Sequence, residues 1–255
     1  ITITAPSTTV TYGDAKPAFL VSQLVLEEDA LYSKDSLADL NSQAQFSITT
    51  DYTKGSPVAD YAVTVSAAAA ATNYEFTFVN GTVKVDKAVL TVTADNKTIT
   101  FGEAAPYFTY TLSGWVTDDR TAPTGTPDIT TAYVSGNHAG QYAISIEKGT
   151  LAHPNYTFNV VGGTLTVNKL SIDTSGVTVK ADIVHGSVYS TAVFTESSIG
   201  TVPGTFVLKD ANAVADYTKA DNPHPILGNY MVVTGIFTPT DSDNYNAVEV
   251  SVNLY

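Results

Sequence analysis

The feature that most constrains the fold is a stretch of sequence that recurs. Residues 73–85 read NYEFTFVNGTVKV, residues 155–167 read NYTFNVVGGTLTV, and a weaker third occurrence, NYNAVEVSV, stands at residues 244–252. Self-similarity of this kind is typical of tandem arrays, in which each repeat is one structural unit. We therefore divide the 255-residue chain into three repeats: residues 1–87, residues 88–169 and residues 170–255.

The first two repeats also open alike. Residues 1–4 read ITIT and precede VTYGDAKP at residues 10–17, while residues 90–93 read LTVT and precede ITFGEAAP at residues 99–106. In the third repeat the dipeptide HG at residues 185–186 stands where the other two carry an aromatic residue and glycine. The third repeat has therefore diverged from the first two.

Short segments of alternating apolar and polar residues indicate strands. Such segments begin at Tyr61, Tyr142 and Tyr230, one in each repeat, directly after a turn-like stretch. A tyrosine in this place is similar to the tyrosine corner of immunoglobulin-like sandwiches, whose phenol bonds back to upstream backbone. Charged residues make up only 15% of the sequence, which favours strands over exposed helices. We predict an all-β protein of three tandem β-sandwich (Ig-like) domains in an elongated array.

Two segments carry helix-forming residues within this β-rich chain. Residues 24–40 should form one or two helical turns at most, because their leucines make no long apolar stripe. If this helix packed across a sheet, β-grasp-like units would be the alternative fold. The five alanines at residues 67–71 lie between two strands, so we expect tertiary context to override their helix propensity. Residues 200–206 predict an added hairpin in the third repeat.

Charge and composition exclude several classes of partner. The net charge is −13 and Arg120 is the only arginine, so phosphate groups lack their usual ligands and we expect no nucleic acid partner. No run of about 20 apolar residues is present, and we expect no membrane insertion. The absence of cysteine excludes disulfides and thiolate chemistry. Because Ile1 lies inside an expected strand, we expect the chain to be a segment of a longer protein. We also expect it to be monomeric in solution.

Two motifs together carry a family resemblance. The pattern Tyr-Gly-Asp/Glu-Ala-x-Pro occurs early in a repeat, at residues 12–17, and Asn-Tyr-x-Phe-x-x-x-x-Gly-Thr-x-x-Val occurs late, at residues 73–85. Residues 1–169 carry both motifs in two copies, with Phe101 and Glu103 as departures, and resemble the MBG repeats of bacterial cell-surface proteins and adhesins. Residues 170–255 look more like a generic bacterial Ig-like unit.

The resemblance implies an extracellular location on a bacterial cell surface. It further implies a non-catalytic stalk or adhesion module, which presents or contributes to attachment to a host glycoprotein, mucin or matrix protein. A specific carbohydrate- or protein-binding module is the alternative function, and an accessory region of a secreted enzyme is a third. No motif for an activated serine, a catalytic metal or a phosphate cradle is present, so we predict no enzymatic activity.

Candidate binding residues are few. Trp115, the only tryptophan, could stack on a sugar ring or a peptide, with packing in the core as the alternative. We expect no cofactor, and Ca²⁺ is the one ion that the sequence suggests: Asp241 and Asp243 offer carboxylates in one turn, although they do not match an EF-hand loop. A solvated acidic turn is the alternative interpretation of these two residues.

The connections between repeats are short. Few residues separate the strands that end near Val85 and Val167 from the strands that follow, and these connections contain no glycine or proline. Such linkers predict a semi-rigid array. Lys87 and Lys169 each enter the next strand, and a lysine–asparagine isopeptide bond is one hypothesis for their role.

Overall fold

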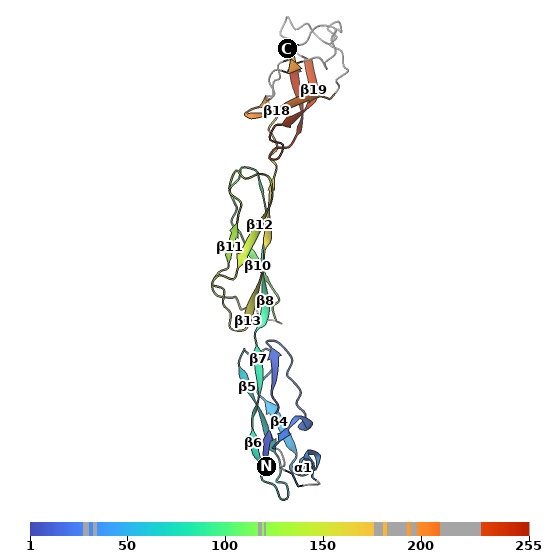
Figure 1. Ribbon diagram of the computed structural model, residues 1–255, viewed down its shortest axis with the longest axis vertical. Helices are drawn as coiled ribbons and strands as arrows, with labels where there is room; N and C mark the ends of the chain where they lie inside the picture. The colour runs from blue at the N-terminus through green and yellow to red at the C-terminus, as the bar shows by residue number, and fades with distance from the viewer. Residues whose placement is uncertain are drawn as a thin grey trace. The chain divides into compact units, whose positions relative to one another are not determined.

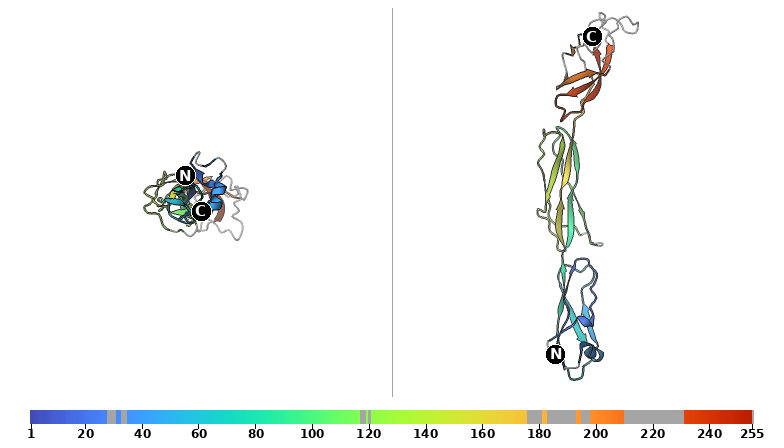
Figure 2. Two further views of the ribbon diagram at one scale, coloured as in Figure 1. Left: turned by 90° about the horizontal axis from the view of Figure 1, so that it is seen from below. Right: turned by 45° about the vertical axis from the view of Figure 1, so that its right-hand side comes forward.

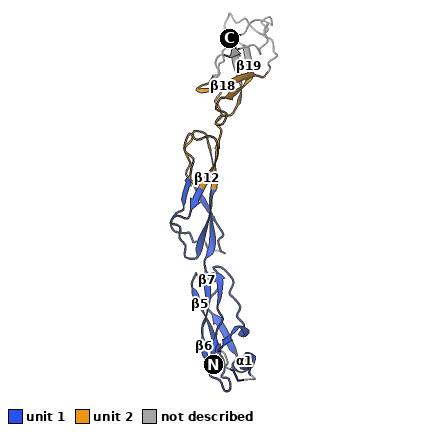
Figure 3. Cartoon of the chain, viewed as in Figure 1, with its two compact units in different colours: residues 1–95, 109–130, 145–162 blue, residues 96–108, 131–144, 163–255 orange. Residues whose placement is uncertain are grey.

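The computed structural model describes residues 1–27, 31–32, 35–116, 119, 121–175, 181–182, 193–194, 198–209 and 231–254. The chain divides into two compact units (Figure 3): unit 1 holds residues 1–95, 109–130 and 145–162, and unit 2 holds residues 96–108, 131–144 and 163–255. Unit 1 therefore contains the connection between the first and second repeats. Unit 2 contains the connection between the second and third repeats.

The first repeat forms two sheets within unit 1 (Figure 1). Its strands are β1 (Thr2–Thr4), β2 (Thr8–Thr11), β3 (Val25–Leu26), β4 (Phe46–Thr50), β5 (Asp60–Ala67), β6 (Thr77–Val79) and β7 (Gly81–Asp86). The sheet orders are β3-β1-β6 and β2-β7-β5-β4. Strand β1 runs parallel to β6 and strand β2 runs parallel to β7, so the first strands of the repeat pair with its last ones.

Alternation of side chains explains why these two sheets pack on each other. In β5 and β7 the buried positions recur every second residue, as a strand with one face on a core requires. Val63, Val83 and Val85 from the four-stranded sheet join Ile3 from the three-stranded sheet in one hydrophobic cluster. The first repeat is thus a β-sandwich, and the all-β prediction is confirmed.

The helical segment of the first repeat lies later than predicted. Helix α1 spans Leu37–Ala44, and a 3₁₀ turn, η1, spans Val21–Gln23. The helix begins after Ser36 because the Ser36 hydroxyl accepts a hydrogen bond from the Asp39 amide at 3.2 Å. The middle of the predicted segment 24–40 includes residues outside the described part of the chain. Helix α1 lies beside the strands, near the N-terminus (Figure 1, Figure 2), and the described residues of this repeat show no β-grasp arrangement.

The second repeat has the same strand order as the first. Its strands are β8 (Ala88–Ala94), β9 (Lys97–Thr100), β10 (Tyr110–Ser113), β11 (Asp128–Thr131), β12 (Gly140–Glu147), β13 (Tyr156–Val161) and β14 (Gly163–Asn168). The sheets are β10-β8-β13 and β11-β12-β14-β9, which match those of the first repeat strand for strand. The shared motifs therefore predicted a shared topology correctly.

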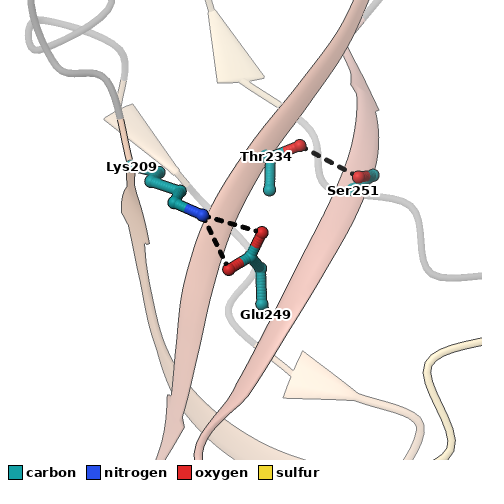
Figure 4. A network of polar contacts seen from close by, with 4 residues as sticks. All are labelled: Lys209, Thr234, Glu249 and Ser251. Carbon is teal, nitrogen blue, oxygen red and sulfur yellow. Dashed lines mark hydrogen bonds and ion pairs between the residues drawn. The ribbon is translucent and has the colours of Figure 1, made fainter.

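The described strands of the third repeat pair in antiparallel fashion. They are β15 (Ala181–Asp182), β16 (Val193–Phe194), β17 (Ser198–Ile199), β18 (Val202–Leu208), β19 (Met231–Pro239) and β20 (Val248–Leu254). Strands β17-β18-β19-β20 form one sheet, and the predicted hairpin is confirmed because Ile199 pairs with Val202 around Gly200. Its strands carry an exposed network (Figure 4), in which Lys209 pairs with Glu249 at 3.0 Å. Exposed pairs of this kind stabilise a fold by about 1 kcal/mol at most.

Two further local predictions can be checked. The Tyr61 hydroxyl donates to the Pro57 carbonyl at 2.9 Å, and the Tyr142 hydroxyl donates to the His138 carbonyl at 2.7 Å. These bonds confirm the tyrosine corners of the first two repeats, whereas Tyr230 lies outside the described residues. The alanine run forms no helix. The described residues also include no helix that is long and apolar enough to cross a lipid bilayer.

Candidate functional site at the repeat junctions

The first junction begins with a turn at the end of the first repeat. The Tyr12 amide donates to the Asp86 carbonyl at 2.8 Å, which holds this turn beside the end of β7. The Asp14 carboxylate accepts a hydrogen bond from the Thr11 amide at 2.7 Å and closes the turn. Gly13 has a φ of 95°, a left-handed conformation that glycine adopts without steric cost. The Tyr-Gly motif is therefore placed where the chain leaves the first repeat.

Asn155, from the loop before β13, binds the end of the first repeat through its side chain and the first residue of the second repeat through its carbonyl. Its side-chain oxygen accepts from the Val58 amide at 3.1 Å, and its carbonyl accepts from the Ala88 amide at 3.1 Å. The Lys87 ammonium donates to the His153 carbonyl at 3.0 Å. All these residues lie in unit 1. The linker and the end of the first repeat are thus fastened to one loop of the second.

Tyr156 is the centre of an aromatic cluster at the same place. Its side chain is 1% exposed. The Tyr12 ring meets it edge-on at a centroid distance of 5.4 Å, Trp115 does so at 5.6 Å and His153 at 4.8 Å. The Tyr156 hydroxyl also accepts a hydrogen bond from the Val116 amide at 2.9 Å. Edge-to-face pairs contribute roughly 0.5–1.5 kcal/mol each beyond their buried area.

Gly13 permits the close approach of the second repeat. A Cβ atom built on Gly13 would lie 1.9 Å from Cγ1 of Val116 and 3.0 Å from its Cβ. No real side chain tolerates the shorter distance. The glycine of the motif is therefore required for two reasons, its backbone conformation and the valine that packs against it.

The second junction, within unit 2, repeats the polar contacts of the first. The Asn244 side-chain oxygen accepts from the Ala139 amide at 2.8 Å, and its carbonyl accepts from the Leu170 amide at 2.8 Å. The Lys169 ammonium donates to the Ser242 carbonyl at 2.7 Å. Each of these groups occupies the same position in its repeat as its counterpart in the first junction.

The aromatic contact is repeated as well. The Phe101 amide donates to the Asn168 carbonyl at 2.8 Å, and the Phe101 ring meets Tyr245 edge-on at a centroid distance of 5.6 Å. At both junctions the aromatic-glycine turn of one repeat contacts the Asn-Tyr pair of the next. The two sequence motifs are thus the two halves of one docking contact.

Asp119 adds a polar contact to the first junction. Its carboxylate accepts a hydrogen bond from the Tyr12 hydroxyl at 2.9 Å and one from the Thr121 amide at 3.1 Å. Burial acts to raise the pKa of Asp119, but these hydrogen bonds outweigh it, and the pKa lies below its ordinary value. Burial and the adjacent Asp119 raise the pKa of Tyr12.

These opposite shifts predict a pH window for the junction. The contribution of Asp119 is present above the pKa of an unfolded aspartate, about 4, and is lost as the pH falls through the lowered pKa; that of Tyr12 is present below about 10 and is lost as the pH rises through the raised pKa. We expect Trp115 fluorescence to report an acid transition that Asp119→Asn removes, because the amide oxygen still accepts from Tyr12. An unchanged acid transition in that variant would contradict the assignment.

Comparison with protein families decides the identity of the repeats. The model of the MBG domain (YGX type) matches residues 1–84 and 90–166, which is more than half of the chain. The chain belongs to the MBG domain (YGX type) family. The predicted family resemblance is confirmed, and the Tyr-Gly that gives the type its name is the turn at the junction.

Comparisons with individual proteins add little to this. No curated protein matches the chain. The crystal structure of Drosophila N-cadherin EC1-3 aligns with 99% of this chain and 99% of its own, at 12% identity and a TM-score of 0.22. Zebrafish RET cadherin-like domains 1 to 4 align with 76% of this chain and 56% of their own, at 10% identity and a TM-score of 0.18. Scores this low support no statement about function.

The predicted ligand residue of the second MBG repeat lies in the junction. Trp115 is half-buried, and its ring packs against Tyr156. This placement fits the core-packing alternative that the sequence left open. A role of Trp115 in binding stays a prediction.

The two predicted calcium ligands lie in one turn, and calcium binding by them stays a prediction. The Asp241 carboxylate accepts a hydrogen bond from the side-chain amide of Asn244 at 2.8 Å, and Asp243 is exposed. In the part of the chain that the structure describes, no group of three or more His, Asp or Glu side chains could hold a metal ion. Asp241 also holds, by this hydrogen bond, the asparagine that docks on the second MBG repeat.

The lysine ammonium groups are also engaged. Lys87 and Lys169 donate to backbone carbonyls, which cannot form an isopeptide bond. A cavity of about 310 Å³ lies beside the first of them and is lined by Lys148 and His153 among others. The Nδ1 atom of His153 accepts from the Asn155 amide, so the neutral ring carries its hydrogen on Nε2, a buried atom without a described partner. The cavity can hold water or a small group with a hydrogen-bond acceptor.

Proposed function

We propose that the chain is a non-catalytic, extracellular stalk and adhesion module of a bacterial surface protein. The observation that carries this proposal is the recurrence of one docking contact at both junctions, with Asn155 in the first and Asn244 in the second. Consecutive repeats are joined by the same two hydrogen bonds, one to the asparagine side chain and one from the linker lysine, and by an aromatic pair. Repeats joined in this way transmit position along the chain. A module built in this way presents whatever it carries at a set distance from its anchor.

The composition supports this role. The net charge of −13 keeps the surface hydrated and disfavours non-specific association with anionic membranes and nucleic acids. The core of the first repeat is built from aliphatic and aromatic side chains. Attachment to a host glycoprotein, mucin or matrix protein is the finer part of the proposal, and family membership is what supports it.

The stalk function predicts that the first two repeats reorient as one body. In the chain without substitutions, we expect residual dipolar couplings from residues 1–84 and 90–166 to fit a single alignment tensor. Asn155→Ala removes the acceptor of the Val58 amide and should require two tensors, whereas Asn159→Ala, an exposed change on β13, should not. Two independent tensors in the parent chain would contradict a stalk.

The attachment function is tested separately, by binding of the chain to immobilised mucin and matrix proteins with and without Ca²⁺. We expect weak binding that increases steeply when several copies are displayed on one surface, as multivalent contacts do. Tight saturable binding by a single copy, lost in Trp115→Ala and kept in Trp115→Phe, would instead favour a specific binding module. Binding by neither the single chain nor the display would remove adhesion and leave the stalk.

A further inference from the structure

The first repeat carries an Asn-Tyr pair that no described repeat covers. Asn73 and Tyr74 occupy the same positions in the first repeat as the Asn-Tyr pairs at residues 155–156 and 244–245 do in the later repeats. Each of those two later pairs is covered by the repeat that precedes it. Asn73 is exposed, and within the described residues nothing forms a hydrogen bond with its side chain. The docking half that receives a preceding repeat is therefore present and open on the first repeat.

The surroundings of Tyr74 match those of Tyr156. The Tyr32 amide donates to the Tyr74 hydroxyl at 3.1 Å, as the Val116 amide does to Tyr156 at 2.9 Å. The Tyr32 ring meets Tyr74 edge-on at a centroid distance of 5.9 Å, yet it is 71% exposed. The same backbone arrangement thus recurs, with an exposed aromatic ring beside it.

Asp35 corresponds to Asp119 in this arrangement. Each aspartate is the third residue after the one whose amide binds the tyrosine hydroxyl. The carboxylate of Asp119 accepts from Tyr12 of the preceding repeat, whereas Asp35 accepts from Tyr74 of its own repeat at 2.7 Å. The first repeat therefore has a carboxylate, Asp35, that could accept from an incoming tyrosine hydroxyl. Asp35 now accepts from Tyr74 of the same repeat.

The backbone of the open asparagine also differs from that of the docked ones. Asn73 has a φ of 70°, in the left-handed region, whereas neither Asn155 nor Asn244 has a positive φ. An asparagine tolerates this conformation better than most residues. Docking requires the Asn73 carbonyl and side chain to face the same donor pair that Asn155 faces, so the backbone must change at this residue.

We propose that this face, formed by Tyr32, Asp35, Ala71, Asn73 and Tyr74, docks the Tyr-Gly end of a further MBG repeat. The incoming tyrosine hydroxyl would donate to Asp35, a backbone amide to the Asn73 side chain, and a linker lysine to the Ala71 carbonyl. Continuity with the two existing junctions carries the proposal, which rests on the stalk function. A second copy of the first repeat fits because Tyr12 supplies the hydroxyl that Phe101 lacks.

The test is a fusion that places a second copy of residues 1–89 directly before Ile1 of the whole chain. This linker copies the natural one, because Ile1 occupies the place of Leu90 in its repeat. With 15N only in the added copy, by segmental ligation, amide hydrogen exchange is measured at its Val58 and Ala88. We expect both amides to exchange about fivefold to tenfold more slowly than in the fusion carrying Asn73→Ala.

Internal controls separate docking from folding and from the stalk function. Protection of the buried Val63 amide reports that the added copy is folded. A second sample carries 15N only in the original chain; its Val58 docks on Asn155, so the exchange of this amide must not respond to Asn73→Ala. Equal exchange of the added Val58 in both fusions overturns the proposal, and it leaves the stalk function intact as long as the chain's own Val58 stays protected.

A second fusion guards against a copy that does not fold. Residues 1–171 placed before Ile1 bring the second repeat, with Lys169 and Phe101, to the same face, and Ala139 is then the reporter amide. We expect the Ala139 amide of the added copy to be protected from exchange, and Asn73→Ala to remove this protection. Asp35→Asn should leave the exchange of Ala139 unchanged, because Phe101 has no hydroxyl to donate to Asp35. In the first fusion Asp35→Asn should change the Tyr12 hydroxyl signal. Unprotected reporters in both fusions would refute the docking face.

Discussion

Tyr156→Ala is expected to lower the free energy of unfolding of the second repeat by about 3–5 kcal/mol, the range for removing a large aromatic side chain from a core. The ring is 1% exposed and touches Tyr12, Trp115 and His153. Its loss leaves a cavity shared by two repeats. The same change should release the Tyr12 turn and so loosen the first junction.

The measurement is denaturant unfolding followed by fluorescence. Trp115 is the only tryptophan and packs against Tyr156, so its emission reports this region alone. Tyr156→Phe keeps the ring and removes the acceptor of the Val116 amide, and we expect a loss of only about 1–2 kcal/mol. Tyr107→Ala, at a side chain that is 88% exposed, is the matched control and should change little. A loss below about 1 kcal/mol for Tyr156→Ala would show that the cluster does not hold the junction.

The strand content and the repeat topology could be predicted from the sequence because both follow from local pattern. Alternation of apolar residues placed β5 and β12, and the recurrence of two motifs predicted that the first two repeats share one strand order. The helix was predicted too early in the chain because residues 24–40 were chosen for their charged and helix-forming residues. Its actual start is set by the Ser36 cap, which composition does not reveal.

The docking contact could not be predicted because its halves are distant in sequence. Tyr12 and Asp119 are separated by 107 positions, and the sequence pattern does not state which repeat the Asn-Tyr pair faces. By its sequence alone, such a pair is typical of the start of a strand, with the asparagine amide capping a turn. Tyr156 does begin β13, but the Asn155 side chain binds an amide of the preceding repeat. The missed signal was that both motifs occur together with a short linker that carries a lysine, Lys87 or Lys169.

The candidate ligands were chosen for their chemistry, and two of them, Trp115 and Asp241, also make contacts at the junctions. A single tryptophan suggested stacking on a ligand, yet Trp115 packs on Tyr156. Two carboxylates in one turn suggested calcium, yet Asp241 binds the side chain of Asn244. Sequence reasoning recognises residue types that could bind, but it cannot tell whether a neighbouring repeat already occupies them.

Gly13→Ala should have the second large effect, for two separable reasons. Its φ of 95° costs a residue with a Cβ about 1–2 kcal/mol, and the new atom would lie 1.9 Å from Cγ1 of Val116. Overpacking of this kind costs about 1–3 kcal/mol more unless the second repeat moves away. We expect lower stability of the first repeat together with loss of exchange protection at the Val58 amide, which depends on the junction.

Gly55→Ala isolates the backbone term. Gly55 lies in the same repeat with a φ of 88°, and a Cβ there meets no described atom within 4 Å. Gly55→Ala should lower the free energy of unfolding only by the cost of a positive φ. The Val58 amide should stay protected from exchange. Val116→Ala removes the clashing methyl groups, so in combination with Gly13→Ala it should restore much of the protection, a coupling that a double-mutant cycle measures. Gly13→Ala and Gly55→Ala could instead lower the free energy of unfolding equally and leave the Val58 amide protected in both. In that case Gly13 would be needed only for the conformation of its turn, and the docking of the repeats would need another explanation.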